Sequence, residues 1–223
     1  MTVSDISLTA GMRTNLLYLQ NTSQLLNRTQ QRLSSGKKVN SALDNPTNYF
    51  AAQNANQRAS DLSDRKDGMS EAVQTVNATN AGITAITGLI NAAKGVAQSA
   101  LSTSDTTVQS KLASQYNTIR SQIDNLSSDS GYRGLNLLSS INTLTVNFNE
   151  DATSTLGVVG FLANSGGLSL TAASGNWQTV SDITTDTAKM DTAISTLRVN
   201  TQALAANLNI ITTRQSFTDE MIN

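Results

Sequence analysis

Residues 32–45 read RLSSGKKVNSALDN, and this stretch decides how the chain is divided. It joins two long segments whose apolar residues repeat at heptad spacing, which predicts helices. Gly36 is the expected C-terminal cap of the first helix, because glycine adopts the left-handed conformation without steric cost. Asp44 is placed to cap the second helix, and Pro46, the only proline, falls in its first turn. The stretch therefore predicts a hinge between two helices.

The segment before the hinge carries an apolar seam. Ser23 and Gln30 fill the slots that leucine leaves open in an alternating spacing of four and three, and the leucines of the seam are Leu16, Leu19, Leu26 and Leu33. A single helix of about 22 residues does not bury such a seam, so it needs a partner helix in the same chain or in a neighbour. The alternative is an ordinary amphipathic helix folded onto its own domain.

A second, longer helix is expected over residues 45–101. Its apolar register is Leu62, Met69, Val73, Val76, Ile83, Ile86, Ile90, Ala93, Ala97 and Ala100. At 1.5 Å per residue such a helix is about 85 Å long, a length typical of a coiled-coil-like rod. A break near Asp67-Gly68 is the alternative. Each glycine in the helix costs up to about 1 kcal/mol relative to alanine, so we expect close approach of another backbone at Gly68, Gly82, Gly88 and Gly95.

Two further helices complete the pattern. A one-sided stripe predicts a helix over residues 105–127, formed by Val108, Leu112, Tyr116, Ile119, Ile123 and Leu126. Heptads return over residues 181–220 at Ile183, Thr187, Met190, Ile194, Leu197, Thr201, Leu204, Leu208 and Ile211. Asp182 and Asp186 lie near the start of this helix, where carboxylates interact favourably with the helix dipole.

The region between these helices, residues 135–178, has a different character. Leu144, Val146 and Phe148 alternate with polar residues, and this period of two favours a strand in a small β-hairpin region. The predicted fold is therefore mainly α: an elongated antiparallel helical rod, a coiled-coil-like three-helix bundle with a small β region. Its core should include Val73, Val76, Ile83, Ile119, Ile123, Leu197 and Leu204.

Composition supports a slender bundle and narrows the function. Only 38% of the 223 residues are hydrophobic and 4% aromatic, which is little material for a broad interior. The net charge of −1 gives no basic face for phosphates, so nucleic acid is not an expected partner. No apolar run approaches the roughly 20 residues of a membrane helix, and residues 1–11 lack the pattern of a cleaved signal peptide. Membrane insertion is therefore not expected.

No constellation of catalytic or metal-binding residues stands out. With no histidine and no cysteine, the common general bases, nucleophiles and zinc ligands are missing. Ser34 and Lys37 form a Ser-x-x-Lys spacing without its companion motifs. Asn147, Asn149 and Asp151 are spaced like calcium ligands, but the glycine and the closing glutamate of that loop are missing. Asp61, Asp64 and Asp67 alternate with basic residues as on a solvated helix face. We expect no enzyme, cofactor or metal site.

The motif at residues 32–45 resembles the signature of bacterial flagellins almost residue for residue. Residues 130–138, SGYRGLNLL, resemble the turn before the family's small β region, and residues 144–148, LTVNF, its first strand. Near the end, residues 205–210 and 213–217 resemble the family's C-terminal rod helix. These matches occur in the family's order and cover most of the chain.

The resemblance implies a structural subunit that self-assembles into the flagellar filament used for swimming. Residues 1–43 would be the N-terminal inner-tube helix and hinge, and residues 44–223 the rod domain. Leu16, Leu19, Leu26 and Leu33 would carry self-assembly, and the hinge motif would be Arg32, Leu33, Ser34, Ser35, Gly36, Asn40 and Asp44. The implied partners are other flagellin subunits, the type III export apparatus, and the junction and cap proteins. The protein would be secreted and extracellular, in the bacterial flagellum.

The chain also departs from the family pattern. Flagellins continue into a C-terminal inner-tube helix that pairs with the N-terminal segment, and residues 1–223 do not contain it. We expect a fragment rather than a shortened paralogue. Two other functions remain as alternatives. One is the hook-filament junction protein, which has a related rod, and the other is a secreted helical adhesin or effector.

Overall fold

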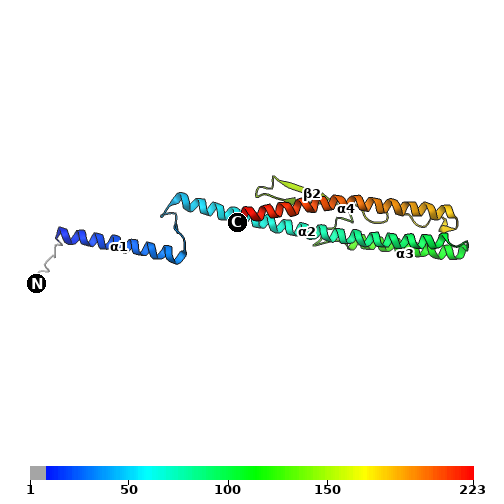
Figure 1. Cartoon of the computed structure of the whole chain (residues 1–223), viewed down its shortest axis with the longest axis horizontal. Helices are drawn as coiled ribbons and strands as arrows, with labels where there is room; N and C mark the ends of the chain where they lie inside the picture. Colours follow the sequence, from blue (N-terminus) through cyan, green and yellow to red (C-terminus); the bar gives the residue numbers. More distant parts are fainter. Residues whose placement is uncertain (1–8) are drawn as a thin grey trace. The chain divides into compact units, whose positions relative to one another are not determined.

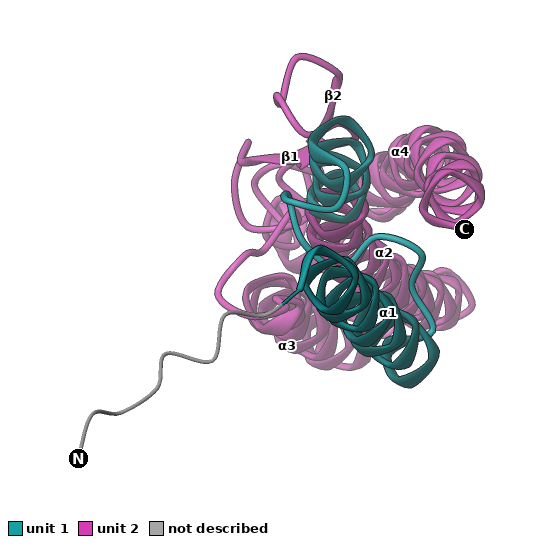
Figure 2. Cartoon of the chain, turned by 90° about the vertical axis from the view of Figure 1, so that its left-hand side faces the viewer, with its two compact units in different colours: residues 1–58 teal, residues 59–223 magenta. Residues whose placement is uncertain are grey.

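The computed structural model describes residues 9–223, which form two compact units. Unit 1 comprises residues 1–58 and unit 2 residues 59–223 (Figure 2). In chain order the elements are α1 (Ala10–Ser35), α2 (Pro46–Leu101), α3 (Thr106–Asp129), β1 (Thr143–Asn147), β2 (Thr155–Val159), the short 3-10 helix η1 (Ser174–Trp177) and α4 (Val180–Ile222). The division between the units falls within α2. The first eight residues of the expected N-terminal segment lie outside the described residues.

Unit 1 contains α1, the hinge and the beginning of α2. Thr9 caps α1, because its hydroxyl accepts a hydrogen bond from the backbone N–H of Met12 (3.4 Å). Gly36 ends the helix with a φ of 65°, so the predicted glycine cap is confirmed. The cap of α2 was assigned to the wrong residue. The side chain of Asn45, and not that of Asp44, accepts from a backbone N–H in the first turn, that of Asn48 (3.1 Å).

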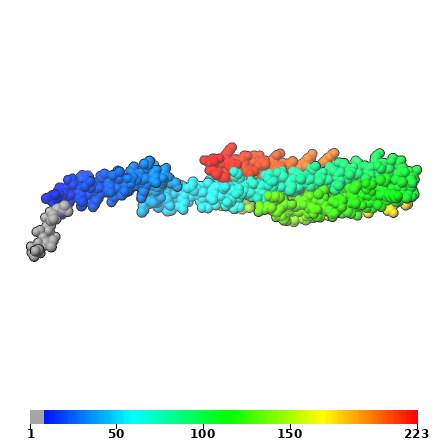
Figure 3. Space-filling model, turned by 90° about the horizontal axis from the view of Figure 1, so that it is seen from below, coloured from blue at the N-terminus to red at the C-terminus, as the bar shows by residue number. Residues whose placement is uncertain are grey.

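Unit 2 is built on three long helices that lie side by side (Figure 1). α4 runs antiparallel to α2, and polar contacts fix their register. Lys66 pairs with Asp219 (2.6 Å), Gln215 donates to the hydroxyl of Ser70 (2.8 Å), and Lys94 pairs with Asp191. In the space-filling view the C-terminal part of α4 lies along α2 (Figure 3). α2 is continuous through Gly68, so the alternative break near that residue does not occur.

The core of unit 2 follows the predicted seams closely. Buried residues on α2 run from Leu62 to Ala100, and those on α4 from Ile183 to Thr218. Val76, Ile83, Ile123, Leu197 and Leu204 are buried as predicted, and Val73 and Ile119 pack against the core while partly buried. Val108 is an exception at 41% exposed, because it lies in the first turn of α3. The predicted mainly-α three-helix fold with a small β region is confirmed.

A β-hairpin and long loops pack onto the helices. β1 and β2 are antiparallel, with Thr143 opposite Val159 and Asn147 opposite Thr155. Inward-facing side chains of this region join the helical core, and the sequence patterns missed most of them: Leu137, Leu138, Val158, Ala163, Leu168, Leu170 and Trp177. Apart from Val158 in β2 and Trp177 in η1, these residues lie in loops, so they follow no regular period.

Only one of the expected glycine contacts is present. A Cβ added at Gly82 would lie 2.4 Å from the hydroxyl oxygen of Ser130 and 2.7 Å from Leu138, so the absence of a side chain lets the loop after α3 approach α2. At Gly68, Gly88 and Gly95, apart from the neighbouring backbone of α2 itself, no atom among residues 9–223 lies within 4 Å of an added Cβ. The described part of the chain therefore supplies no close backbone contact at those three glycines.

No helix among residues 9–223 combines the length and the apolar character needed to span a membrane.

Replacing Ile194 with Asp is expected to destabilise unit 2 severely, because it places an unpaired charge in the seam between α4 and its neighbours. Ile194→Val, which removes one methylene group, should cost only about 0.5–1.5 kcal/mol. Circular-dichroism melts of the two variants and the wild type measure the difference. An unchanged melting temperature for Ile194→Asp would contradict the assignment of this residue to the core.

Candidate functional site

The apolar seam of α1 is exposed along its whole length. α1 has no buried residue, and Leu16, Leu19, Leu26 and Leu33 are between 48% and 84% exposed. The predicted seam therefore forms one continuous stripe that nothing in unit 1 covers. An exposed stripe of large apolar side chains is a mark of an interaction surface.

A second apolar face lies beside this seam, and the heptad reading missed it. Tyr18 and Leu25 are seven residues apart and both largely exposed. The hydroxyls of Thr22 and Thr29 donate to backbone carbonyls one turn earlier, at 2.8 Å each, so these threonines present methyl groups. A shallow groove of about 380 Å³ is lined by Tyr18, Asn21, Thr22, Leu25, Leu26 and Thr29. Apolar atoms thus cover two adjacent faces of α1, which suits contact with more than one neighbouring helix.

Hydrogen bonds between residues of the hinge hold its conformation. The hydroxyl of Ser35 donates to the side-chain oxygen of Asn40 (2.6 Å), whose backbone N–H donates to a carboxylate oxygen of Asp44 (3.2 Å). The backbone N–H of Asp44 donates to the carbonyl of Ser41 (3.1 Å). The other oxygen of Asp44 lies 3.8 Å from the guanidinium of Arg28. Asp44, predicted as a helix cap, is instead the residue that ties the hinge to α1.

Some residues of the hinge motif line a polar hollow, and others do not. A polar hollow of about 890 Å³ is lined by Asn27, Gln30, Gln31, Ser34, Ser35, Asn40, Ser41 and Asp44. Of the motif, Ser34, Ser35, Asn40 and Asp44 meet at this hollow, while Arg32, Leu33 and Gly36 are not part of its lining. Amide and hydroxyl groups predominate there. Such groups bind by hydrogen bonds and do not supply a general base.

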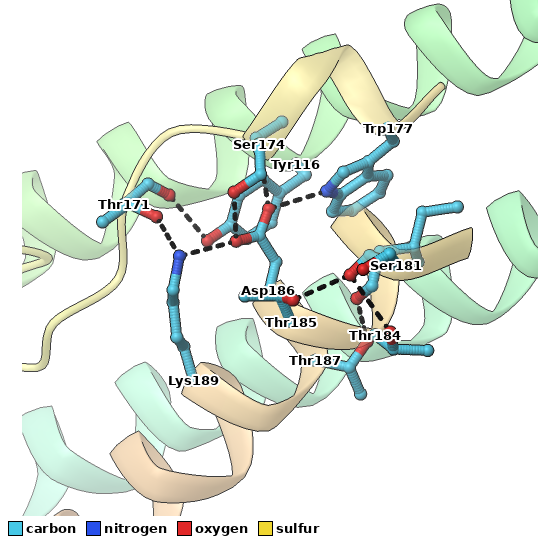
Figure 4. Close-up of polar contacts among 12 residues, drawn as sticks. Tyr116, Thr171, Ser174, Trp177, Ser181, Thr184, Thr185, Asp186, Thr187 and Lys189 are labelled. Carbon is cyan, nitrogen blue, oxygen red and sulfur yellow. Dashed lines mark hydrogen bonds and ion pairs between the residues drawn. The ribbon is translucent and has the colours of Figure 1, made fainter. Parts of the chain in front are cut away.

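A buried polar cluster at the start of α4 is the most tightly hydrogen-bonded group in the described chain (Figure 4). The carboxylate of Asp186 accepts from the backbone N–H (2.8 Å) and hydroxyl (2.9 Å) of Ser174, the indole N–H of Trp177 (2.9 Å) and the ammonium of Lys189 (2.9 Å). The ring of Tyr116 stacks on that of Trp177 at 5.0 Å between centroids. The cluster fastens the loop before α4 to both α3 and α4.

The backbone beside this cluster is strained. Gly175, Asn176 and Trp177 all have left-handed conformations, with φ of 52°, 48° and 58°. For the two non-glycine residues such a conformation costs about 1–3 kcal/mol each, and it persists only where the surrounding structure compensates for that cost. Full burial of the Trp177 ring and its hydrogen bond to Asp186 provide that compensation.

The ionisation of this cluster follows from burial and hydrogen bonding. Burial by itself raises the pKa of Asp186, but the hydrogen bonds from Ser174, Lys189 and Trp177 outweigh it and bring the pKa below its ordinary value. Burial, aided by the charge of Asp186, raises the pKa of Tyr116 to about 12. Asp186 was expected to act through the helix dipole, and that expectation was incomplete. Its acceptor capacity is used by these specific donors, so the cluster has a structural role.

The residues with formal resemblance to catalytic or metal sites do not converge. Within residues 9–223 there is no group of three or more His, Cys, Asp or Glu side chains that could hold a metal ion. The side chain of Asn149 is engaged in its own turn, accepting from the backbone N–H of Ser154 (2.9 Å) and donating to the hydroxyl of Thr153 (2.6 Å). The candidate site is therefore the apolar surface of α1 together with the hinge.

Comparison with known proteins agrees with this arrangement. Residues 6–143 match the family described as "Bacterial flagellin N-terminal helical region". The chain is 27% identical over 226 aligned positions to flagellin FljO of Caulobacter vibrioides, covering 99% of this chain and 81% of the relative. Flagellin FljK of the same organism is 28% identical over 206 positions, with 88% and 72% covered. The crystal structure of Bacillus cereus flagellin superposes with a TM-score of 0.58 at 17% identity, covering 68% of this chain and 88% of that one.

Asp186→Asn is expected to lower the stability of unit 2, because an amide cannot replace a carboxylate as acceptor for all of these donors. Each buried donor left unsatisfied costs about 1–3 kcal/mol. Since the folded pKa of Asp186 lies below its ordinary value of 3.8, its contribution to stability is complete above that pH and is lost as the pH falls further. Wild-type melting temperatures should therefore decrease below about pH 4 more steeply than those of the variant. Parallel slopes for both proteins would contradict this role.

Proposed function

This chain belongs to the bacterial flagellin family, and from that premise we propose that its α1 surface is the part that joins subunits in the filament. The protein is a structural subunit of the flagellar filament. The observation that carries the proposal is the exposed seam of α1. A helix of 26 residues with no buried side chain obtains no packing energy from its own unit, so partner helices must supply it.

The two apolar faces of α1 support a tube rather than a pair of helices. A coiled-coil dimer needs only one narrow seam, whereas a helix inside a closed ring of helices contacts a neighbour on either side. The seam of Leu16, Leu19, Leu26 and Leu33 would meet one neighbour, and the groove beside Tyr18 and Leu25 the next. We therefore assign residues 1–43 to the inner tube and hinge, and residues 44–223 to the rod.

The hinge would set how α1 is presented. Arg32, Leu33, Ser34, Ser35 and Gly36 end α1, and Asn40 and Asp44 close the connection through hydrogen bonds. Its contacts are local in sequence, so the hinge can form as soon as the chain leaves an export channel. This suits a subunit that is exported unfolded and folds at its destination.

Several finer features are proposed on the same basis. The protein would pass through the flagellar export apparatus, meet the junction and cap proteins, and reside outside the cell in the flagellum. It would turn over no substrate, since the family is structural. Many weak contacts repeated along a helical lattice would hold it in place.

The double variant Leu19→Gln and Leu26→Gln is expected to abolish incorporation into filaments while leaving the melting of unit 2 unchanged. Both leucines are exposed, so their replacement removes no intrachain packing. Electron microscopy of a seeded assembly reaction, together with a thermal melt, measures both effects.

The matched control is Leu17→Gln, since Leu17 is equally exposed but lies off the seam. It should assemble like the wild type. Normal filaments from the double variant would rule out the α1 seam as the joining surface. A short collar, or no assembly of the wild type, would instead indicate a junction protein or a secreted helical adhesin.

A further inference from the structure

α4 carries a second seam, on the outside of unit 2. Its residues are Val199, Ala203, Ala206, Ile210, Thr213 and Phe217, called here the α4 outer seam. They repeat with alternating spacing of four and three, and all are exposed. The neighbouring stripe of Leu204, Ile211 and Thr218 is buried against the rest of unit 2. α4 thus has one seam that packs against its own chain and a second seam that remains exposed.

α2 carries an exposed face whose residues have the same spacing but small side chains or none. Its residues are Ala81, Ala85, Gly88, Ala92, Gly95 and Ser99, called here the α2 small-residue face, and all are exposed. Glycine weakens a helix, and apart from the neighbouring backbone of α2 itself no atom of residues 9–223 lies within 4 Å of a Cβ added at Gly88 or Gly95. Contacts inside the chain therefore do not explain these glycines. A hollow of about 420 Å³ opens beside them, lined by Gly95, Gln98, Ser99, Leu101 and Ser102.

Both faces are almost free of charge. From Ala72 to Ser104 the only charged residue is Lys94, which pairs with Asp191. From Val199 to Thr218 the only charged residue is Arg214, whose guanidinium lies over the ring of Phe148 at 5.3 Å. Surfaces of helices normally carry many charges, and depletion of charge marks the centre of protein interfaces.

We propose that the α4 outer seam of one copy packs antiparallel on the α2 small-residue face of a second copy, with Phe217 and Ile210 against Gly88 and Gly95. The match follows from spacing, because the two large residues and the two glycines are each seven positions apart. A large side chain on α4 fills the space over a glycine on α2, so the two helices pack without voids and approach each other closely. The inference rests on the proposed role of the protein as a filament subunit.

The orientation follows from the fold. α2 and α4 are antiparallel within one copy, so they remain antiparallel across a contact between two copies that point the same way. The two faces differ, which makes the contact heterologous. Such a contact leaves a free face at each end and extends into a polymer instead of closing into a dimer.

The register also fixes a stagger between copies. Within one chain the pairs Lys66–Asp219 and Lys94–Asp191 place Gly88 level with Leu197. In the proposed contact Gly88 is level with Phe217 of the second copy, which lies 20 positions further along α4. At 1.5 Å per residue, neighbouring copies are displaced by about 30 Å along the helix axis.

Cysteine cross-linking tests the contact directly, because the chain has no cysteine of its own. Ser99→Cys in one copy and Ala206→Cys in another lie opposite each other in this register, and a disulfide forms when the Cα atoms are about 4.4–6.8 Å apart. Oxidising an equal mixture of the two variants at high concentration should give a heterodimer on a non-reducing gel. The yield should be about tenfold above that of Ser99→Cys mixed with Thr212→Cys, an exposed α4 position that faces away from the α4 outer seam.

A second experiment uses the glycines. Gly95→Gln fills the space reserved for Ile210, so the concentration needed for filament assembly should rise by at least about tenfold. Gly68→Gln is the matched control, since Gly68 is also helical and open but lies on the opposite side of α2. Each substitution should raise the melting temperature of the free chain by about 2–4 °C, because glutamine favours the helix.

The possible results test the proposed contact and the proposed function separately. Equal yields when Ser99→Cys is mixed with Ala206→Cys and with Thr212→Cys, or unimpaired assembly of Gly95→Gln, would overturn the contact while wild-type filaments upheld the function. A dominant cross-link between Leu26→Cys and Ala206→Cys would show that α1 occupies the α4 outer seam, which also overturns it. A wild type that forms no filaments would refute the function, and the cross-linking yields would still decide the contact.

Discussion

The structure of unit 2 depends on the apolar stripe of α2, which packs on both α3 and α4. Isoleucines fill the middle of this stripe at positions 83, 86 and 90, and alanines replace them at 93, 97 and 100. The helices therefore carry less and less side-chain volume towards the turn between α2 and α3. With only 4% aromatic residues in the chain, stability comes from a long, narrow seam and not from a broad core. A helix pair of this kind tolerates little change in side-chain volume, because every layer of the seam contains few residues.

Polar contacts stabilise the part of unit 2 that the narrow apolar core does not hold in place. The loop before α4 contains no regular element that could bury a wide apolar face, and Asp186 fastens it through donors from the loop and from α4. A buried carboxylate is stable there only because its hydrogen-bonding capacity is used. The strained turn at Asn176 and Trp177 is held by the same bonds. At the end of unit 2 where α4 begins, the hydrogen bonds of Asp186 thus stabilise both the buried carboxylate and the strained backbone.

The distribution of satisfied and unsatisfied surfaces suits a subunit that must remain separate until it is assembled. Inside unit 2 the seams are closed, whereas α1 and the outer face of α4 present apolar side chains to solvent. A single helix-to-helix contact is small beside the 1,200–2,000 Å² typical of stable protein interfaces, so two copies alone would bind weakly. Repetition on a helical lattice multiplies such contacts, and a polymer becomes stable where a pair is not.

The sequence by itself determined the helices, the hinge and their order, because heptad spacing, Gly36 and Pro46 act within a few turns of one helix. It also identified the α1 seam, whose spacing needs no tertiary information. The sequence also predicted which stripe of α4 is buried, but only the tertiary structure showed that a second stripe of the same period, from Val199 to Phe217, stays exposed. The same holds for Asp186 and Trp177, which lie in one cluster with Tyr116. A loop brings these residues together, and no short-range pattern encodes contacts between residues that are far apart in the chain.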